Sequence, residues 1–346
     1  MFKFKISTFL AFCGIAAATF FLAAPFKAQA EIVIYTALED DEIPKYLAAF
    51  KEDHPEIKVK FIRDSTGVIT AKLLAEKDNP QADVIWSVSA TSLIVLDDAG
   101  LVEPYAPKGL NKVNPKMRDT ANPPAWVGTK AYMDAFVLNN HEQKNLNLPA
   151  PDNYQALLDP RYKNQITMPN PASSGTGYLA VAGILQLMGE EAGWAYLDAL
   201  DKNIAQYTHS GSKPAKMAAS GEAALGITLC YRAAMQEQKG DPITVYYPKE
   251  GSGWDVEANA LVKKANINPE AKVFLDWAIS QNAMNNYASF FPVTAVPTKV
   301  PVPAGYPAKP ADQLIKNNDL KWAAENRERI LKEWTKRYDS KSEPKK

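Results

Sequence analysis

Short apolar runs alternate with segments of helical spacing along the first hundred residues. Residues 32–36, 57–61 and 82–86 predict three strands, and residues 43–50 and 68–77 predict helices between them. Strands that alternate with helices favour a mostly parallel sheet. Because ligands bind beyond the carboxyl ends of such strands, the loops after these strands are the first candidates for a binding site.

The pattern continues to the end of the chain, and its length exceeds what a single core usually supports. We therefore expect two lobes, with residues 31–133 and 256–300 in the first and residues 134–255 and 301–346 in the second. Strands predicted at 132–139 and 258–262 would cross between the lobes. Further strands are expected at 166–169 and 225–229, helices at 93–99, 178–188, 190–201, 213–220, 268–280 and 320–334, and an extended proline-rich segment at 291–310.

The first thirty residues have the pattern of a secretory signal peptide. Lys3 and Lys5 precede an apolar run over residues 9–24, and the small-residue signal Ala28-Gln29-Ala30 follows it. We expect cleavage after Ala30 and a periplasmic mature protein. The alternative is a retained membrane anchor, since the apolar run approaches the length that spans a bilayer.

Composition excludes several classes of protein. The 39 Lys and Arg residues balance 39 Asp and Glu residues, so no basic excess is available to neutralise nucleic-acid phosphates. Two cysteines cannot form a disulfide scaffold, and removal of the leader would leave Cys230 alone. An apolar stretch precedes Cys230, which favours a buried, unreactive thiol.

Two loops share a pattern that is typical of anion binding. Ser65-Thr66-Gly67 and residues 173–177 (Ser-Ser-Gly-Thr-Gly) each stand just before a predicted helix. Free backbone N–H groups and the positive end of the helix dipole bind anions there, and hydroxyl groups add donors. Ordinary helix capping explains either loop alone, but two such loops in separate lobes favour an anion site. Neither loop has the lysine of a P-loop, so nucleotide hydrolysis is not indicated.

Other chemistry has weaker support. The three histidines are scattered without metal-ligand spacing, and there is no nucleophile-elbow motif, so we expect no metal, cofactor or catalytic residue. Tyr231 and Arg232 are expected at the end of a strand, where they either offer a phenol and a guanidinium to an anion or, in the case of Tyr231, pack on a neighbouring residue. Trp254 and Asp255 follow a flexible Gly-Ser-Gly and either line a cleft or close a turn.

Several motifs together resemble those of type II periplasmic solute-binding proteins, the receptors of ABC importers. The resemblance is broad to the ferric-iron-binding branch and close to the 2-aminoethylphosphonate-binding proteins. It implies an α/β fold of two lobes, each a mixed, mostly parallel sheet flanked by helices, with ligand in the cleft between them. It also implies a monomeric, non-enzymatic protein that delivers its ligand to an ABC transporter permease. The motifs lie at residues 35–39, 64–67, 82–86, 100–105, 171–178, 221–226 and 291–294.

One departure from the resemblance bears on the ligand. The iron-binding branch places adjacent tyrosines where this chain has Cys230-Tyr231-Arg232. A guanidinium at this place repels a cation and attracts an oxyanion, which favours 2-aminoethylphosphonate over iron. A sugar phosphate or a polyamine in the same architecture and a secreted phosphorus-ester hydrolase stay open as alternatives.

The expected ligand-binding residues fall into two groups. The first would hold the phosphonate, and the second would hold the amine through a carboxylate or an aromatic ring. The phosphonate group is Ser65, Thr66, Ser87, Ser89, Ser173, Ser174, Gly175, Thr176 and Tyr231, and the amine group is Tyr35, Glu39 and Asp255. Thr36 and Gly67 are further expected ligand-binding residues within the same loops.

Overall fold

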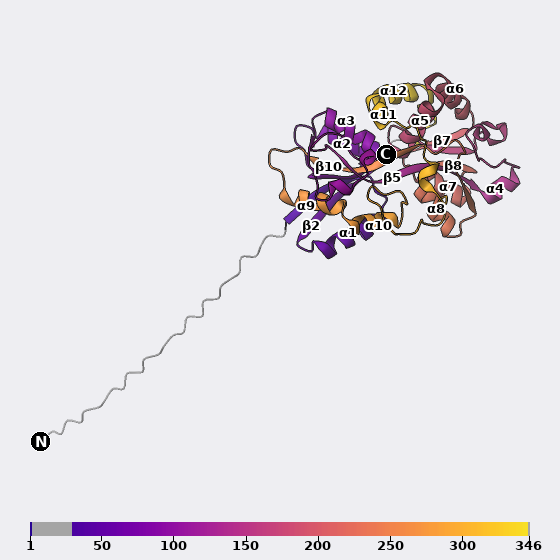
Figure 1. The fold of residues 1–346 in the computed structure, drawn as a ribbon. Coiled ribbons are helices and arrows are strands. Elements are labelled where there is room, and N and C mark those ends of the chain that lie inside the picture. Colours follow the sequence, from indigo (N-terminus) through magenta and orange to yellow (C-terminus); the bar gives the residue numbers. More distant parts are fainter. Residues whose placement is uncertain (2–29, 345–346) are drawn as a thin grey trace.

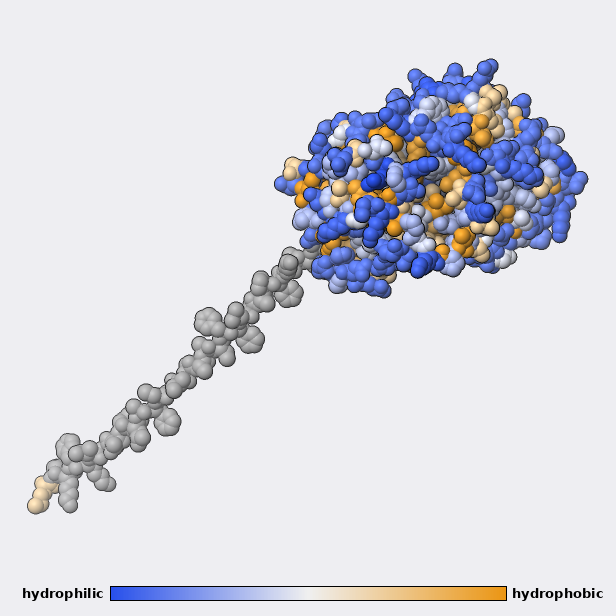
Figure 2. Space-filling view, viewed as in Figure 1, coloured by the Kyte–Doolittle hydropathy of each residue, from blue (hydrophilic) through white to orange (hydrophobic). Residues whose placement is uncertain are grey.

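The computed structural model describes residue 1 and residues 30–344, and residues 30–344 form two lobes side by side (Figure 1). The predicted leader lies almost wholly on residues outside this range, and so does most of its cleavage signal. No helix within the described residues combines the length and the apolar character needed to cross a membrane. The face shown in Figure 2 is largely hydrophilic, with apolar patches scattered over both lobes.

The first lobe is built from the strand–helix units that the amino-terminal pattern predicts. Its first strand pairs in parallel with the second and third strands, as expected for such units. The elements are β1 (Ala30–Thr36), α1 (Ile43–Asp53), β2 (Ile57–Arg63), α2 (Thr66–Ala75), β3 (Val84–Ser89), α3 (Ala90–Asp98), β4 (Val102–Glu103), η1 (Leu110–Lys112), η2 (Pro115–Met117), β10 (Trp254–Val262), α9 (Pro269–Ala278) and α10 (Gln281–Ala288).

The second lobe has its own parallel strands, β6 with β7 and β8. Its elements are α4 (Asn140–Asn145), η3 (Gln155–Leu158), η4 (Pro160–Tyr162), β6 (Ile166–Pro169), α5 (Gly175–Met188), α6 (Glu190–Asp201), β7 (Ile204–Thr208), α7 (Lys213–Ser220), β8 (Leu225–Leu229), α8 (Cys230–Gln238), β9 (Ile243–Tyr246), η5 (Pro310–Gln313), α11 (Leu320–Glu325), α12 (Arg327–Tyr338) and η6 (Asp339–Lys341).

A long strand, β5 (Val127–Asn139), joins the two lobes. Its first half pairs with β10, and its second half, from Asp134 onward, pairs with β8 and β9. The resulting sheet has the order β2-β1-β3-β10-β5-β8-β6-β7, with antiparallel strands at its centre and parallel strands toward its edges. Two separate apolar cores pack on the two ends of this sheet. The lobe boundaries predicted at 133/134 and 255/256 fall inside β5 and β10, where the chain crosses.

Several local predictions differ from the structure. The predicted loop 87–91 is the end of β3 and the start of α3, because the polar serines there are buried. Tyr231 and Arg232 lie in the first turn of α8, not at a strand end. The predicted terminal helix is divided at Asn326 into α11 and α12. The sequence pattern did not indicate α4, β7, α8 and α10.

Candidate ligand-binding site

The amino-terminal ends of α2 and α5 meet across the boundary between the lobes. The N–H of Gly67 in α2 donates a hydrogen bond of 2.8 Å to the carbonyl of Ser173, just before α5. A Cβ atom on Gly67 would lie 2.0 Å from the carbonyl oxygen of Ala172, so only glycine permits this approach. The two Ser/Thr-Gly loops that the sequence singled out are therefore brought together.

A small cavity of about 40 Å³ lies between these helix ends. Both lobes contribute to its walls, and most of the residues are polar. The lining residues are Ala37, Glu39, Arg63, Ser65, Thr66, Ser87, Tyr132, Ser174, Gly175, Thr176, Gly211, Leu229 and Glu257.

Hydroxyl groups of the first lobe surround the first residue of α5. A Cβ atom on Gly175 would lie 2.8 Å from each of the hydroxyl oxygens of Thr66, Ser89 and Tyr132. The hydroxyls of Ser89 and Tyr132 are hydrogen-bonded to each other. The absence of a side chain at Gly175 thus leaves backbone and hydroxyl donors from two lobes facing one small space.

The helix ends differ in how their polar groups are used. Ser174 caps α5, since its Oγ accepts a hydrogen bond of 3.2 Å from the N–H of Gly177. Ser65 stands at the cap position of α2, but its side chain makes no such bond. Within the described part of the chain, the amides of Thr66, Gly175 and Thr176 have no hydrogen-bond acceptor. Helix capping therefore explains the Ser174 hydroxyl before α5, whereas the Ser65 and Thr66 hydroxyls at the start of α2 have no capping role.

Ser87 has a strained backbone at the wall of the cavity. Its φ is +50°, a left-handed value that costs a residue other than glycine about 1–3 kcal/mol. Its N–H donates to the side-chain oxygen of Asn259 over 3.0 Å, and its buried hydroxyl lies beside the carboxylate of Glu257, whose charged form it stabilises. Strain of this kind is typical of functional sites, because surrounding contacts must be built to hold it.

Arg63 supplies the guanidinium of the cavity. Its Nε donates to the carbonyl of Leu38 over 2.8 Å, and one terminal nitrogen lies 3.4 Å from a carboxylate oxygen of Glu39. Arg232, whose guanidinium was considered as a donor to an anion, does not line the cavity. It reaches across from the second lobe to Glu39 at 3.0 Å and to Asp41 at 2.9 Å, and its pKa is raised by these partners although burial lowers it.

A buried charge cluster reaches the wall of the cavity at Glu257. The ammonium of Lys130 lies 3.0 Å from Glu257 and 3.2 Å from Glu42, and Lys130 is completely buried. The rings of Tyr46, Tyr287 and Phe291 surround it, with centroids at most 5.0 Å from the ammonium. Burial raises the pKa of Glu257 to about 7.

Some predicted residues lie outside this cavity. The hydroxyl of Tyr35 donates to Glu76 over 3.0 Å, on the side of β1 that faces α2, and the ring of Tyr35 lies below Lys72. The hydroxyl oxygen of Thr36 is buried and accepts a bond from the backbone N–H of Leu38. These side chains are already engaged and do not reach the cavity.

Three more predicted residues, Tyr231, Asp255 and Ser173, contact other residues of the protein. Tyr231 packs on Phe291 with ring centroids 5.1 Å apart. Asp255 accepts a hydrogen bond of 2.6 Å from Thr91, and burial raises its pKa to about 6. The Ser173 hydroxyl donates to the carbonyl of His209 over 2.8 Å. Of these three residues, none lines the cavity.

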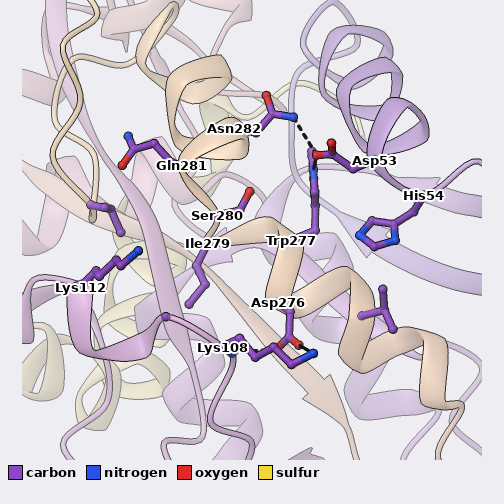
Figure 3. Close-up of a pocket in the computed structure, with 13 residues that line it drawn as sticks. Asp53, His54, Lys108, Lys112, Asp276, Trp277, Ile279, Ser280, Gln281 and Asn282 are labelled. Atoms are coloured by element: carbon purple, nitrogen blue, oxygen red, sulfur yellow. Dashed lines mark hydrogen bonds and ion pairs between the residues drawn. The ribbon is translucent and has the colours of Figure 1, made fainter.

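A larger pocket of about 530 Å³ lies on the surface of the first lobe (Figure 3). Its carboxylates are already paired. Asp276 contacts the ammonium of Lys108 at 3.4 Å, and Asp53 accepts hydrogen bonds from Trp277 and Asn282. Donors from two lobes do not converge there, so the interlobe cavity is the better candidate site.

Among residues 30–344, no group of three or more His, Cys, Asp or Glu side chains is arranged to hold a metal ion. Cys230 is buried, and burial raises its thiol pKa to about 12. This agrees with the expectation of an unreactive thiol.

Residues 79–321 match the family of bacterial extracellular solute-binding proteins. The chain belongs to this family. It is therefore the substrate-binding component of an ABC importer, which binds a small molecule for delivery to a membrane permease and is not an enzyme. The two-lobed α/β fold is the one that the resemblance implied.

Individual relatives carry different names. The chain is 31% identical over 280 residues to an uncharacterised protein of Haemophilus influenzae, with 80% of this chain and 79% of that protein covered. It is 26% identical over 262 residues to an Fe(3+)-binding periplasmic protein of Serratia marcescens, with coverage of 72% and 74%. It is 24% identical over 274 residues to a protein of Salmonella typhimurium that has been given the provisional name of 2-aminoethylphosphonate-binding periplasmic protein, with coverage of 75% and 77%.

A solved structure is similar over nearly the whole fold. This is the periplasmic binding protein AfuA of Actinobacillus pleuropneumoniae with exogenous fructose-6-phosphate bound. The TM-score is 0.83 at 28% identity, and the match covers 90% of this chain and 99% of that one.

Proposed function

We propose that this solute-binding protein captures a small phosphorus oxyanion, with 2-aminoethylphosphonate as its ligand, in the cavity between α2 and α5. The observation that carries the proposal is the meeting of two helix amino termini from different lobes, with unpaired amides at both. Each terminus attracts negative charge through its N–H groups and its dipole.

The remaining donors of the cavity suit a tetrahedral oxyanion. Hydroxyls of Ser65, Thr66 and Ser87 and the guanidinium of Arg63 line the same space. Hydrogen bonds from such groups to a charged oxygen are roughly twice as strong as neutral ones. Several donors from different directions fit an anion with three oxygens better than they fit a flat carboxylate.

Iron is less well supported as the ligand, although one relative is named as an Fe(3+)-binding protein. Tyr231, at the place where the iron-binding branch has its tyrosines, packs against Phe291 and does not line the cavity. The positive ends of two helix dipoles, together with Arg63, would repel a cation placed between the helix ends. Two other relatives are named for or contain a phosphorus compound, which agrees with the donor set.

A sugar phosphate is the second candidate. The AfuA structure contains fructose-6-phosphate, and it is similar to this chain over both lobes. The small cavity of about 40 Å³ favours the shorter aminophosphonate when the lobes lie as they do here. Both ligands would use the same oxyanion donors and differ only in the groups that meet the rest of the solute.

We also propose that the protein is a periplasmic monomer, secreted by a signal peptide cleaved after Ala30. The extracellular character of the family and the leader pattern in the sequence support this proposal. Intact-mass analysis of the secreted protein tests the cleavage site. A product that begins at Glu31 is expected, and a product that retains Lys27 would contradict it.

Titration calorimetry tests the ligand. The mature protein is titrated with 2-aminoethylphosphonate, fructose 6-phosphate, inorganic phosphate, ferric citrate and putrescine. We expect the tightest binding with 2-aminoethylphosphonate, and a stabilisation of about 2.7 kcal/mol at a hundred-fold excess over Kd. Tighter binding of ferric citrate or putrescine would overturn the oxyanion proposal, and tighter binding of fructose 6-phosphate would replace the aminophosphonate with the second candidate.

A further inference from the structure

Glu257 is the carboxylate of the cavity whose charge is least compensated. Within the described residues its cationic contact is Lys130, at 3.0 Å, and Lys130 is shared with Glu42 at 3.2 Å. The buried cluster therefore combines two carboxylates with one ammonium. The tyrosines packed around it, Tyr46, Tyr132 and Tyr287, are neutral at ordinary pH because burial raises their pKa values.

The other carboxylate of the cavity has a different environment. Glu39 contacts two guanidinium groups, Arg63 at 3.4 Å and Arg232 at 3.0 Å. Because these two guanidinium groups compensate the charge of Glu39, its carboxylate contributes little net negative charge to the cavity. Asp255, the other carboxylate that the sequence suggested for an amine, lies outside the cavity and is held by Thr91.

An excess negative charge in a buried cluster is unfavourable, since a buried ion that lacks a full partner is strongly destabilising. The high pKa of Glu257, about 7, is a consequence of this burial. A cationic ligand group beside Glu257 would supply the missing positive charge. Ser87, on the neighbouring strand β3, adds a buried hydroxyl beside this carboxylate at the same wall of the cavity.

We propose that Glu257 is the specificity-determining residue that recognises a primary ammonium group on the ligand. The site then selects solutes that carry a phosphorus oxyanion at the helix ends and an amine at the β10 wall. This inference rests on the proposed oxyanion site, and it assigns the amine to a residue that neither the family resemblance nor the sequence pattern indicated.

The test compares two ligands that differ only in the amine, 2-aminoethylphosphonate and ethylphosphonate. Their dissociation constants are measured by calorimetry for the mature wild-type protein, Glu257→Gln and Glu39→Gln. We expect the wild type to prefer the amine-bearing ligand by about ten-fold to a hundred-fold, as for a hydrogen bond to a charged group. Glu257→Gln should lose most of this preference, with ethylphosphonate affinity little changed.

Glu39→Gln is the matched control, because it neutralises the other carboxylate of the same cavity. It is expected to keep the preference between the two ligands even where disturbed closure weakens both affinities, since their ratio cancels that effect. Loss of the preference in Glu39→Gln, or its retention in Glu257→Gln, would overturn the proposal.

Melting curves show whether each variant is folded. If a variant does not fold, the two wild-type affinities still test the proposal. Equal wild-type affinities for the two phosphonates would overturn the role of Glu257 while leaving the oxyanion site intact. Failure of the wild type to bind any phosphonate or phosphate would instead refute the proposed function itself. The two failures are thus distinguishable.

Discussion

Replacing Thr66 with valine removes one hydroxyl from the cavity and keeps the shape of the side chain. The Thr66 hydroxyl lies within 2.8 Å of the Cβ position of Gly175 and forms no hydrogen bond with any other described residue. It does not cap α2, so its removal should leave the unliganded protein as stable as the wild type. Because the Thr66 hydroxyl has no partner among the described residues, its removal should change the affinity for the ligand and not the stability of the unliganded protein.

The expected loss of affinity follows from the charge of the ligand. A hydrogen bond to a charged group contributes roughly 1.5–3 kcal/mol, and about 1.4 kcal/mol corresponds to a factor of ten. Thr66→Val should therefore weaken 2-aminoethylphosphonate binding by about ten-fold to a hundred-fold. Backbone donors at both helix ends remain, so binding should not be abolished.

Ser174→Ala should behave differently, because the Ser174 hydroxyl oxygen also accepts the bond from Gly177 N–H that caps α5. Loss of such a cap costs about 1 kcal/mol, which lowers the melting temperature of a chain of this size by on the order of 2 °C. This variant should lose both affinity and stability. Because the two residues hold one ligand from two lobes, the double variant should show non-additive losses.

Calorimetric titration and melting curves of the unliganded proteins measure both quantities. Thr70→Val is the matched control, since the Thr70 hydroxyl donates to the carbonyl of Thr66 one turn into the same helix and does not line the cavity. It should keep wild-type affinity. Wild-type affinity in Thr66→Val, or a fall in its melting temperature equal to that of Ser174→Ala, would refute the reasoning.

Three further predictions follow from other parts of the structure. Gly175→Ala should abolish measurable binding in a titration, because the new methyl group would lie 2.8 Å from three hydroxyl oxygens; retained affinity would contradict the close approach of the lobes. Arg232→Met removes the buried contacts to Glu39 and Asp41, so the variant should bind more weakly and show a larger radius of gyration by X-ray scattering; unchanged scattering and affinity would show that these contacts do not hold the lobes together. Asp134→Asn should stabilise the protein at pH 8 by roughly 4 kcal/mol and have little effect at pH 4. The Asp134 carboxyl loses its proton near pH 3.8 in the unfolded chain and near pH 7 in the folded protein, so the wild-type free energy of unfolding falls as the pH rises between these values. Equal pH profiles of the two proteins in denaturant titrations would contradict this.

The parts of the site that could be predicted from the sequence have local signals. A Ser/Thr-Gly loop before a helix is readable within a few residues, and the structure places both such loops at the cavity. Glu39 was also predicted as a ligand-binding residue, and it lines the cavity, although two guanidinium groups occupy its carboxylate. These residues need only their own segment to take up the geometry that the pattern indicates.

The residues that the sequence did not reveal depend on partners far along the chain. Arg63, Tyr132 and Glu257 lie singly in strands, and nothing in their neighbours separates them from other charged or aromatic residues. Lys130 and Glu257 meet because β5 and β10 pair in register, over a separation that no local pattern records. Arg232 was considered as a donor to the ligand for the same reason, since its acidic partners lie about 190 residues earlier.

Because the oxyanion donors come from both lobes, the contacts that select the ligand are also the contacts that favour closure of the lobes. A ligand shifts an equilibrium between open and closed states only by its difference in affinity for the two. Here Thr66 and Arg63 belong to the first lobe, whereas Ser174, Gly175 and Thr176 belong to the second, so an open protein can offer an anion only one set. The hydrogen bond between Gly67 and Ser173 forms at the same contact, and it becomes available only when the helix ends meet. A solute without an oxyanion cannot engage both helix ends, and it therefore provides little free energy for closing the lobes.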